Sequence, residues 1–502
     1  MDSGESSYSQ EEKGSLESLH VGNKSMPQNL ASLSKEDYAR LSRRATLKLD
    51  LVMMPILLIM YVLNYLDRQN IASARLAGLQ EDLGMTDVQY QTAVSILFIG
   101  YILAQTPSNL LASKITWPGI YICMGMAAWG AMSALTAVVH DFSHLLAIRA
   151  LLGVIEAIFF PGALFLLSQF YNRKQFALRT AILYSGSQIG NAVGGLFAIG
   201  ILQLDGQRGL SGWRWLFLIE GISTVVIASI FSFFLPNSHQ KKIIFLTPLE
   251  HEFIRYNYTS DHNSNHSNYS DEETSSWKGF VLAISDPKLW LITGILYCTY
   301  TVGTVVNFFP SVIQSLGYPL TTTYGLTCPP FVLCILAMLF NGWHSDRSQE
   351  RFYHILTPLL LCLVTNIILL LSPANDIVAR YFAIVLLPGC VYAATVVALS
   401  WLTTNMMAGP AAKKAAAIAV SNSIYNTPNI WGSYLFFGRP RYLVAFGVFV
   451  GVTVLAAGFA VGARVYLVKQ NRKLDNRGEE GEGLGRFGPT REQVEKGFRF
   501  TL

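Results

Sequence analysis

Apolar segments of about 20 residues recur along this chain, and they constrain its fold more than any other feature. A helix of that length crosses the hydrocarbon core of a bilayer. Hydrophobic residues fill 51% of the 502 positions and charged residues only 14%, whereas soluble domains carry about 25% charged residues. We therefore predict an all-α membrane protein with twelve transmembrane helices. The predicted spans are 49–68, 88–111, 118–139, 143–168, 178–203, 214–235, 288–314, 322–343, 354–371, 377–401, 412–437 and 441–468.

Polar segments divide these spans into two sets of six. A long polar break over 237–286 separates 46–236 from 287–470, so we expect two six-helix bundles joined by a central loop. Many secondary transporters are built from two such parallel repeats. The terminal segments 1–45 and 471–502 are polar and charged, and they are expected to be disordered.

Basic residues are distributed according to the predicted topology. With both termini inside, most lysines and arginines fall on the inner side, as the positive-inside rule requires. Both termini and the central loop are therefore expected in the cytoplasm, and the protein is expected to be a monomer in the plasma membrane, with a vacuolar membrane as the alternative. The net charge of +5 is scattered and forms no basic face for nucleic acid.

Enzymatic chemistry finds no support in the sequence. The six cysteines lie in or near predicted spans without metal-ligand spacing, and the nine histidines lie in termini, loops or span edges. No nucleophile and base are paired in a recognisable arrangement. We expect no enzymatic activity, no metal and no cofactor.

Carboxylates inside the predicted spans are confined to the N-terminal half, at Asp67, Glu156 and Glu220. An ionised side chain in a bilayer costs at least about 2.5–3.5 kcal/mol, so such residues normally face a partner or a polar cavity. If the protein carries protons, its N-terminal half is expected to carry them. Glu220, near the start of its span, is interpreted most simply as an interfacial anchor.

Arg149 and Glu156 lie seven residues apart, on nearly the same helix face and about 10 Å apart along the axis. Gly153 lies between them and would let another helix approach closely. Each charged group is therefore expected to meet another helix, or the two line one cavity at different depths. A fixed ion-pair network that only holds helices together is the alternative, for Asp67 as well.

Uncharged polar residues also recur inside the spans, several at i, i+4 spacing on one helix face. They either line a cavity or form hydrogen bonds between helices. Among them Tyr65, Tyr101, Gln188, Asn422 and Asn426 are the candidates for substrate binding. The others are Tyr61, Asn64, Gln105, Asn191, Tyr300 and Asn307.

The turn after the eighth span reads Gly342-Trp-His-Ser-Asp346-Arg347. An Asp-Arg pair at such a turn can clamp neighbouring helix ends in one conformation, which predicts a gating role. An ordinary solvated loop is the alternative.

Three sequence motifs resemble the anion:cation symporter branch of the major facilitator superfamily. They are Asn64-Tyr65-Leu66-Asp67-Arg68, Arg149-x-x-x-Gly153-x-x-Glu156 and Gly212-Trp-Arg-Trp-Leu-Phe-Leu-Ile-Glu220-Gly221. The resemblance is closest to fungal allantoate, nicotinate and pantothenate permeases. It covers the first six spans with specific motifs and the second half more loosely.

The resemblance implies a two-bundle fold with a central cavity and alternating access. In that branch the matching carboxylates, here Asp67 and Glu156, are linked to protons. The arginine matching Arg68 holds the substrate carboxylate, and Tyr65 lines the same site. Tyr101 and Asn422 or Asn426 match more weakly, and Arg149 is expected to tune Glu156.

The sequence therefore predicts proton-coupled uptake of a small organic anion such as a vitamin or carboxylate metabolite. The span over 186–195 lacks the Gly-Pro signature similar to that of drug:proton antiporters, which favours uptake over efflux. An exporter or exchanger of a secondary metabolite is one alternative, and a nutrient sensor that does not transport is another.

Overall fold

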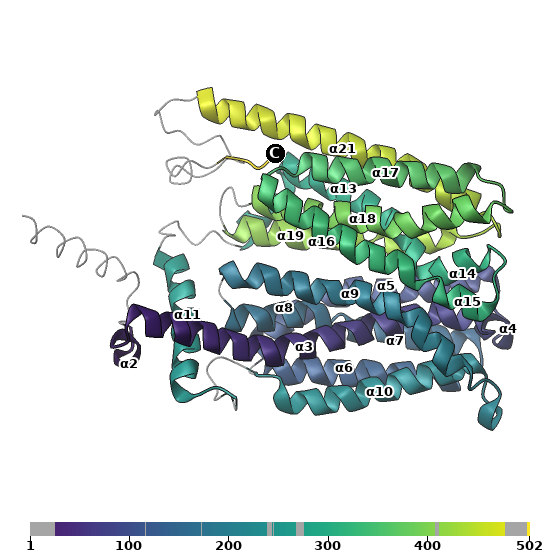
Figure 1. Ribbon diagram of the computed structural model, residues 1–502, viewed down its shortest axis with the longest axis horizontal. Coiled ribbons are helices and arrows are strands. Elements are labelled where there is room, and N and C mark those ends of the chain that lie inside the picture. Colours follow the sequence, from purple (N-terminus) through teal and green to yellow (C-terminus); the bar gives the residue numbers. More distant parts are fainter. Residues whose placement is uncertain are drawn as a thin grey trace, which may run out of the picture.

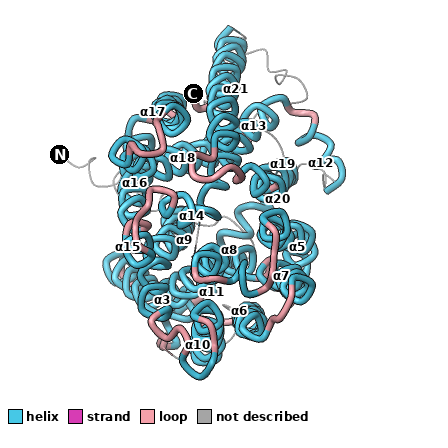
Figure 2. The backbone as a smooth tube through the Cα atoms, turned by 90° about the vertical axis from the view of Figure 1, so that its right-hand side faces the viewer, coloured by secondary structure: helices cyan, strands magenta, loops and turns pink. Residues whose placement is uncertain are grey.

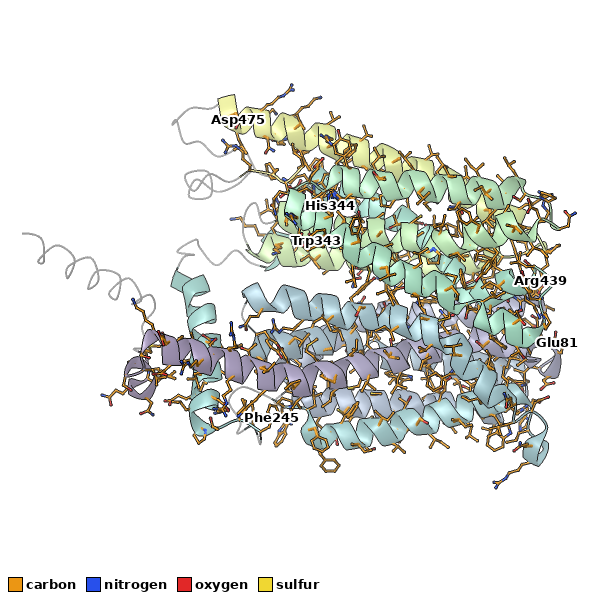
Figure 3. All side chains as sticks on the ribbon, in the orientation of Figure 1. Glu81, Phe245, Trp343, His344, Arg439 and Asp475 are labelled. Carbon is orange, nitrogen blue, oxygen red and sulfur yellow. The ribbon has the colours of Figure 1, made fainter. Side chains whose placement is uncertain are left out.

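The computed structural model describes residues 26–115, 117–171, 173–237, 243, 245–267, 276–406, 411–476 and 499–502. Every regular element within these ranges is a helix (Figure 1). We call the end of the molecule that holds residues 26–34 and 499–502 the proximal end, at the left of Figure 1. The opposite end, which holds α4, is the distal end; Glu81 and Arg439 mark it in Figure 3.

The N-terminal half supplies the first six crossings, which are α3, α5, α6, the pair α7 and α8, α9, and α10. The elements are α2 (Gln28–Ala31), α3 (Lys35–Leu76), α4 (Leu79–Asp82), α5 (Asp87–Lys114), α6 (Pro118–Leu135), η1 (Thr136–Val138), α7 (Phe142–Glu156), α8 (Phe159–Phe170), α9 (Arg173–Leu202), η2 (Gln207–Gly209) and α10 (Gly212–Phe234).

The C-terminal half supplies six more crossings, and three of these consist of several short helices in series. The elements are α11 (Pro248–Ser267), α12 (Ser276–Ile284), α13 (Pro287–Gly303), η3 (Thr304–Phe308), α14 (Phe309–Gln314), α15 (Leu320–Gly325), α16 (Cys328–Ser348), α17 (Phe352–Leu371), α18 (Ile377–Asn405), α19 (Ala411–Asn426), α20 (Pro428–Trp431), η4 (Gly432–Leu435) and α21 (Leu443–Asn476).

The crossings pack as two bundles, one from each half of the chain (Figures 1 and 2). Within the N-terminal bundle the most extensive pairings are α6 with α10, α3 with α9, and α5 with α7. Within the C-terminal bundle they are α16 with α18, α17 with α18, and α13 with α21. The predicted all-α membrane fold is therefore confirmed.

In the described residues, nine helical segments are long and apolar enough to cross a membrane. The other crossings are α5, part of which lies outside the residues whose side chains are described, α9 and α19. Helix α9 carries polar side chains such as Asn191, which accepts a hydrogen bond from Gln69, and α19 is only 16 residues long. All three helices contribute residues to the cavity described below.

Residues 237–286, expected to form a loop, contain α11 and α12. In Figure 1, α11 lies across the proximal end of the N-terminal bundle. Lys48 of α3 forms an ion pair of 2.7 Å with buried Glu250, and the rings of Tyr38 and Phe253 meet edge to face. These tertiary contacts stabilise a helix whose polar sequence gave no indication of it.

The terminal segments 1–45 and 471–502, which were expected to be disordered, are helical in part. Helix α3 begins at Lys35. The side chain of Ser34, just before it, accepts a hydrogen bond from the backbone N–H of Asp37. At the other end α21 continues to Asn476, and residues 499–502 lie against the bundle. Residues 1–25 and 477–498 lie outside the described residues.

Polar contacts join the two bundles at the distal end. The Tyr324 hydroxyl donates to the carbonyl of Ser73 over 2.7 Å, and the Gln91 amide donates to the carbonyl of Phe436 over 3.3 Å. A Cβ on Gly195 would lie 2.4 Å from the carbonyl oxygen of Tyr324, so only glycine permits this approach. The bundles are thus held together at the distal end, and they separate toward the left of Figure 1.

Gly153 brings α5 and α7 into backbone contact, as the sequence predicted. A Cβ on Gly153 would collide with the carbonyl oxygen of Leu97, and one on Gly100 would lie 2.6 Å from that of Ala150. Both obstacles are backbone atoms, which cannot rotate away. This contact fixes the position of the helix that ends at Glu156.

Replacing Gly153 with alanine should therefore destabilise the protein by about 1–3 kcal/mol, the usual cost of overpacking. Gly200→Ala is the matched control, because a Cβ there meets no atom within 4 Å. It should be neutral or stabilising by up to about 1 kcal/mol, since alanine favours the helix. Thermal unfolding of the purified variants measures both effects. Equal melting temperatures for the two variants would contradict the packing described here.

Candidate functional site

A cavity lies between the two bundles, with residues of both halves in its wall. Its empty space, including its open mouth, is about 1050 Å³. Among its described lining residues Arg68 and Glu156 are the charged ones, and both belong to the N-terminal bundle. The remaining wall is rich in hydroxyl and amide groups. Its tyrosines and asparagines are Tyr61, Tyr65, Tyr101, Tyr184, Tyr300, Tyr392, Tyr425, Asn64, Asn307, Asn422, Asn426 and Asn429.

Arg68 extends from α3 into a box of aromatic rings. Its guanidinium carbon lies 4.9 Å from the ring centre of Tyr101, 5.2 Å from that of Tyr65 and 5.9 Å from that of Phe98. Its Nε donates to Oε1 of Glu156. Aromatic faces attract a guanidinium while leaving its N–H edge free to bind an anion. The rings therefore hold the cation in place without neutralising it.

Glu156 is the last residue of α7, where the crossing breaks before α8. Its Oε1 accepts hydrogen bonds from Asn64 and Arg68, both on α3. Its Oε2 has no hydrogen-bond partner in the described part of the chain, and the side chain is 2% exposed. One oxygen is thus held by the partner helix while the other is available for a proton.

Asp67 points away from the cavity, although it adjoins Arg68 in sequence. Successive residues on a helix differ by about 100° in direction, so 67 and 68 face different neighbours. The Ser133 hydroxyl of α6 donates to Oδ1 of Asp67, and the carboxylate is buried. The two predicted proton-linked carboxylates therefore lie in separate environments, with Glu156 at the cavity wall and Asp67 behind it.

Arg149 is buried in the N-terminal bundle and forms no hydrogen bond or ion pair with Glu156 among the described residues. Its Nε donates to the carbonyl of Ala93 over 3.3 Å. Both Asp67 and Glu156 are close enough to interact with its charge. The expected absence of direct pairing between Arg149 and Glu156 is confirmed, since Glu156 pairs with Arg68 on another helix.

Glu220 is not an interfacial anchor, which corrects the interpretation of its sequence position. Its side chain is buried and its Oε2 accepts a hydrogen bond of 2.6 Å from Asn70. Close packing of α10 on α6 explains this placement: a Cβ on Gly221 would lie 2.6 Å from the carbonyl oxygen of Gly130. The N-terminal bundle therefore has a polar interior behind the cavity wall.

The other predicted lining residues divide into two groups. Tyr65, Tyr101, Asn422 and Asn426 line the cavity. Gln188 does not: it is fully buried, donates to Ser187 over 3.2 Å and lies 3.5 Å from the thiol of Cys334. Its position between α9 and α16 makes it part of the contact between bundles.

The predicted gating pair lies at the proximal end, outside the cavity. Asp346 is 70% exposed and pairs with Arg351 over 2.7 Å. Arg347 lies 5.6 Å from the ring centre of Trp343, which Figure 3 shows at that end. These contacts stay within the C-terminal bundle, and an ion pair so exposed contributes little to stability.

Around Tyr300, which the sequence had indicated, the structure adds three tyrosines that the sequence did not single out, Tyr184, Tyr392 and Tyr425. Tyr184 of α9 and Tyr300 of α13 place their hydroxyl oxygens 3.4 Å apart, across the two bundles. Tyr300 and Tyr425 of α19 have ring centres 4.4 Å apart, and Tyr392 adds a further ring. Tyrosine inside an apolar span was the available signal, and it had indicated Tyr300 but not the other three.

The sequence matches the Major Facilitator Superfamily over residues 57–433. An uncharacterized transporter of Schizosaccharomyces pombe is 32% identical over 402 residues, which cover 79% of this chain and 78% of that protein. The MFS-type transporter cnsO of Penicillium expansum is 31% identical over 442 residues, which cover 85% of this chain and 83% of that protein.

Solved structures of low sequence identity share the fold. A bacterial homologue of the human lysosomal transporter Spinster, in an inward-facing and occupied conformation, gives a TM-score of 0.65 at 17% identity, covering 83% of this chain and 97% of that one. A D-xylose-proton symporter gives 0.61 at 13% identity, covering 82% and 97%. The sequence match, the relatives and the two-bundle fold agree, and the chain belongs to the major facilitator superfamily as a non-enzymatic membrane transporter.

Proposed function

We propose that this chain is a proton-coupled symporter, of the anion:cation branch of its superfamily, that imports a small organic anion. The contact between Arg68 and Glu156 carries the proposal. In the described conformation Glu156 forms an ion pair with the guanidinium group to which an anionic substrate would bind. Protonation of Glu156 removes its charge and frees Arg68 for a carboxylate, which guanidinium binds through two parallel hydrogen bonds.

In this proposal, charge balance couples the binding of the proton to the binding of the anion. The empty cavity holds the cation of Arg68 and the anion of Glu156, whose charges cancel. Binding of a proton together with an anion leaves the sum unchanged. Binding of either one alone leaves an uncompensated charge in a buried site, which costs several kcal/mol. The empty and the fully loaded forms are thus the ones favoured when the cavity closes.

We assign Asp67 a second proton-linked role, exercised from behind the cavity wall. Arg149 interacts with the charges of both Asp67 and Glu156. The two carboxylates also interact with each other directly, so a change in the charge of one affects the other. Ser133 adjusts to either form, since its hydroxyl can donate to a carboxylate or accept from a carboxylic acid.

The lining favours a small carboxylate-bearing metabolite or vitamin, of the size of nicotinate, allantoate or pantothenate. Arg68 offers a guanidinium, the tyrosines offer ring faces and hydroxyls, and the asparagines offer amide groups. A wall of aromatic rings with a few placed polar groups is typical of sites that bind small molecules, and those polar groups fix the orientation of the ligand.

In the proposed orientation both termini lie in the cytoplasm and the protein resides in the plasma membrane. The distal end, where the bundles are joined, then faces outward, and the cavity communicates with the cytoplasm. Asp346 and Arg347 lie at the cytoplasmic end, where we propose that they engage the N-terminal bundle when that end closes.

Glu156→Gln tests the proton step. The substrate is first identified by a thermal-shift screen of small carboxylates at two pH values, in which a bound ligand stabilises the protein. In the wild type the affinity should fall as the pH rises, because ionised Glu156 competes for Arg68. In Glu156→Gln most of this pH dependence should be lost, and the remainder is assigned to Asp67. Uphill uptake into proteoliposomes should fall to background, while exchange of internal for external substrate persists.

Normal proton-driven accumulation by Glu156→Gln would refute the assignment of this residue. Accumulation driven only by the opposite pH gradient would identify an exporter instead.

Arg68→Lys tests the anion clamp. Lysine keeps the charge and loses the planar fork, so affinity for the carboxylate should fall by roughly tenfold to a hundredfold, the worth of one charged hydrogen bond. Arg179→Lys is the matched control, because Arg179 binds the carboxylate of Asp50 through two hydrogen bonds away from the cavity. It should bind the carboxylate as the wild type does. Equal affinities for all three proteins in a titration would exclude Arg68 as the clamp.

A further inference from the structure

Residues 499–502 pack against the proximal end of the C-terminal bundle. Figure 1 shows this last described segment returning to the ends of the green helices. We call the surrounding residues the tail groove. They come from five helix ends, at α13, α17, α18, α19 and α21, and they are Asp286, Lys288, Arg351, Trp401, Asn405, Lys413 and Asn471.

The surrounding residues form hydrogen bonds to the backbone of three consecutive residues of the segment. Asn471 donates to the carbonyl of Phe500 and accepts from its N–H, each over 2.9 Å. Trp401 and Asn405 donate to the carbonyl of Thr501 over 2.8 and 3.2 Å. The backbone N–H of Arg351, just before α17, donates to the carbonyl of Leu502 over 2.7 Å. Donors in such numbers, from separate helices, form a specific site for an extended peptide.

The Phe500 side chain covers a buried ion cluster. Asp286 lies 3.1 Å from the Nζ of Lys288 and 2.7 Å from the Nζ of Lys413, and all three side chains are at most 2% exposed. The ring centre of Phe500, itself 3% exposed, lies 4.6 Å from the Lys288 Nζ. An aromatic face attracts an ammonium ion, and the ring also keeps water away from the cluster.

Three of the helices that form the groove also line the cavity, and α13 is one of them, with Lys288 at one end and Tyr300 in the cavity wall. α18 carries Trp401 at one end and Tyr392 in the cavity wall, and α19 carries Lys413 at one end and Asn426 in the wall. A segment that ties these ends to α17 and α21 restrains the cavity wall itself. The inference does not depend on which substrate the cavity takes.

We propose that residues 499–502 are a built-in peptide ligand of the tail groove, and that their docking holds α18 and α19 in the described arrangement. Release of the segment opens the ion cluster to water and loosens the cavity-lining part of α19. The C-terminal tail is thereby a conformational clamp on the C-terminal bundle.

Amine acylation of the full-length protein, read by mass spectrometry, tests the docking. Lys288 and Lys413 should resist acylation in the wild type. In Phe500→Ala their labelling should rise by roughly fivefold or more, the effect of losing one good contact. The matched control is Arg499→Ala, the neighbouring residue, whose ion pair with Asp475 is exposed on both sides. In Arg499→Ala the two lysines should be acylated to the same extent as in the wild type.

Equal protection of both lysines in Phe500→Ala and the wild type would overturn the docking. Trp401→Phe keeps the ring while removing the donor to Thr501, so it gives the same test if Phe500→Ala fails to fold. Its labelling should rise in the same direction by a smaller factor.

The effect on the cavity is measured separately, by the rate at which a thiol reagent modifies Asn426→Cys. That rate should be higher when Phe500→Ala is added than when Arg499→Ala is added. Newly exposed lysines together with unchanged thiol rates would refute the clamp on α19 while leaving the docking intact.

Discussion

The contact between Arg68 and Glu156 connects the fold of this transporter to its chemistry. It joins α3 to the end of α7 at the wall of the cavity, where both side chains are largely removed from water. A buried ion pair is expensive to separate unless something replaces each partner. An anion can replace Glu156 at Arg68, and a proton can replace Arg68 at Glu156. In the proposed function, this site exchanges its own ion pair for a proton and an anion.

The two bundles contribute differently to this site. The N-terminal bundle supplies both charges and, behind them, a polar interior with Asp67, Ser133, Asn70 and Glu220. The C-terminal bundle supplies uncharged surface, mainly tyrosine rings and asparagine amides. In the proposed mechanism the first therefore binds the charges, while the second shapes the space around the substrate. Glycines at helix contacts, such as Gly153, keep the charged wall in a fixed place.

Much of this arrangement could be predicted from the sequence, because length and hydropathy determine which segments cross a bilayer. The cost of a buried charge likewise singled out Glu156, and the family motifs singled out Arg68. Their pairing could not be predicted, since periodicity gives the face of one helix and not the identity of its neighbour. For the same reason Gln188 was expected in the cavity wall and lies between helices, and Glu220 was expected at the interface and is buried. The tail was missed because its docking depends on backbone hydrogen bonds, which leave no mark in composition.

The most direct test of the exchange is the number of protons taken up when substrate binds. A pH indicator in weakly buffered solution reports this for the purified protein near neutral pH, once the carboxylate that stabilises it is known. The proposed exchange predicts that the wild type takes up a proton with each bound anion and that Glu156→Gln binds the anion without proton uptake. Anion binding to the wild type without any proton uptake would contradict it.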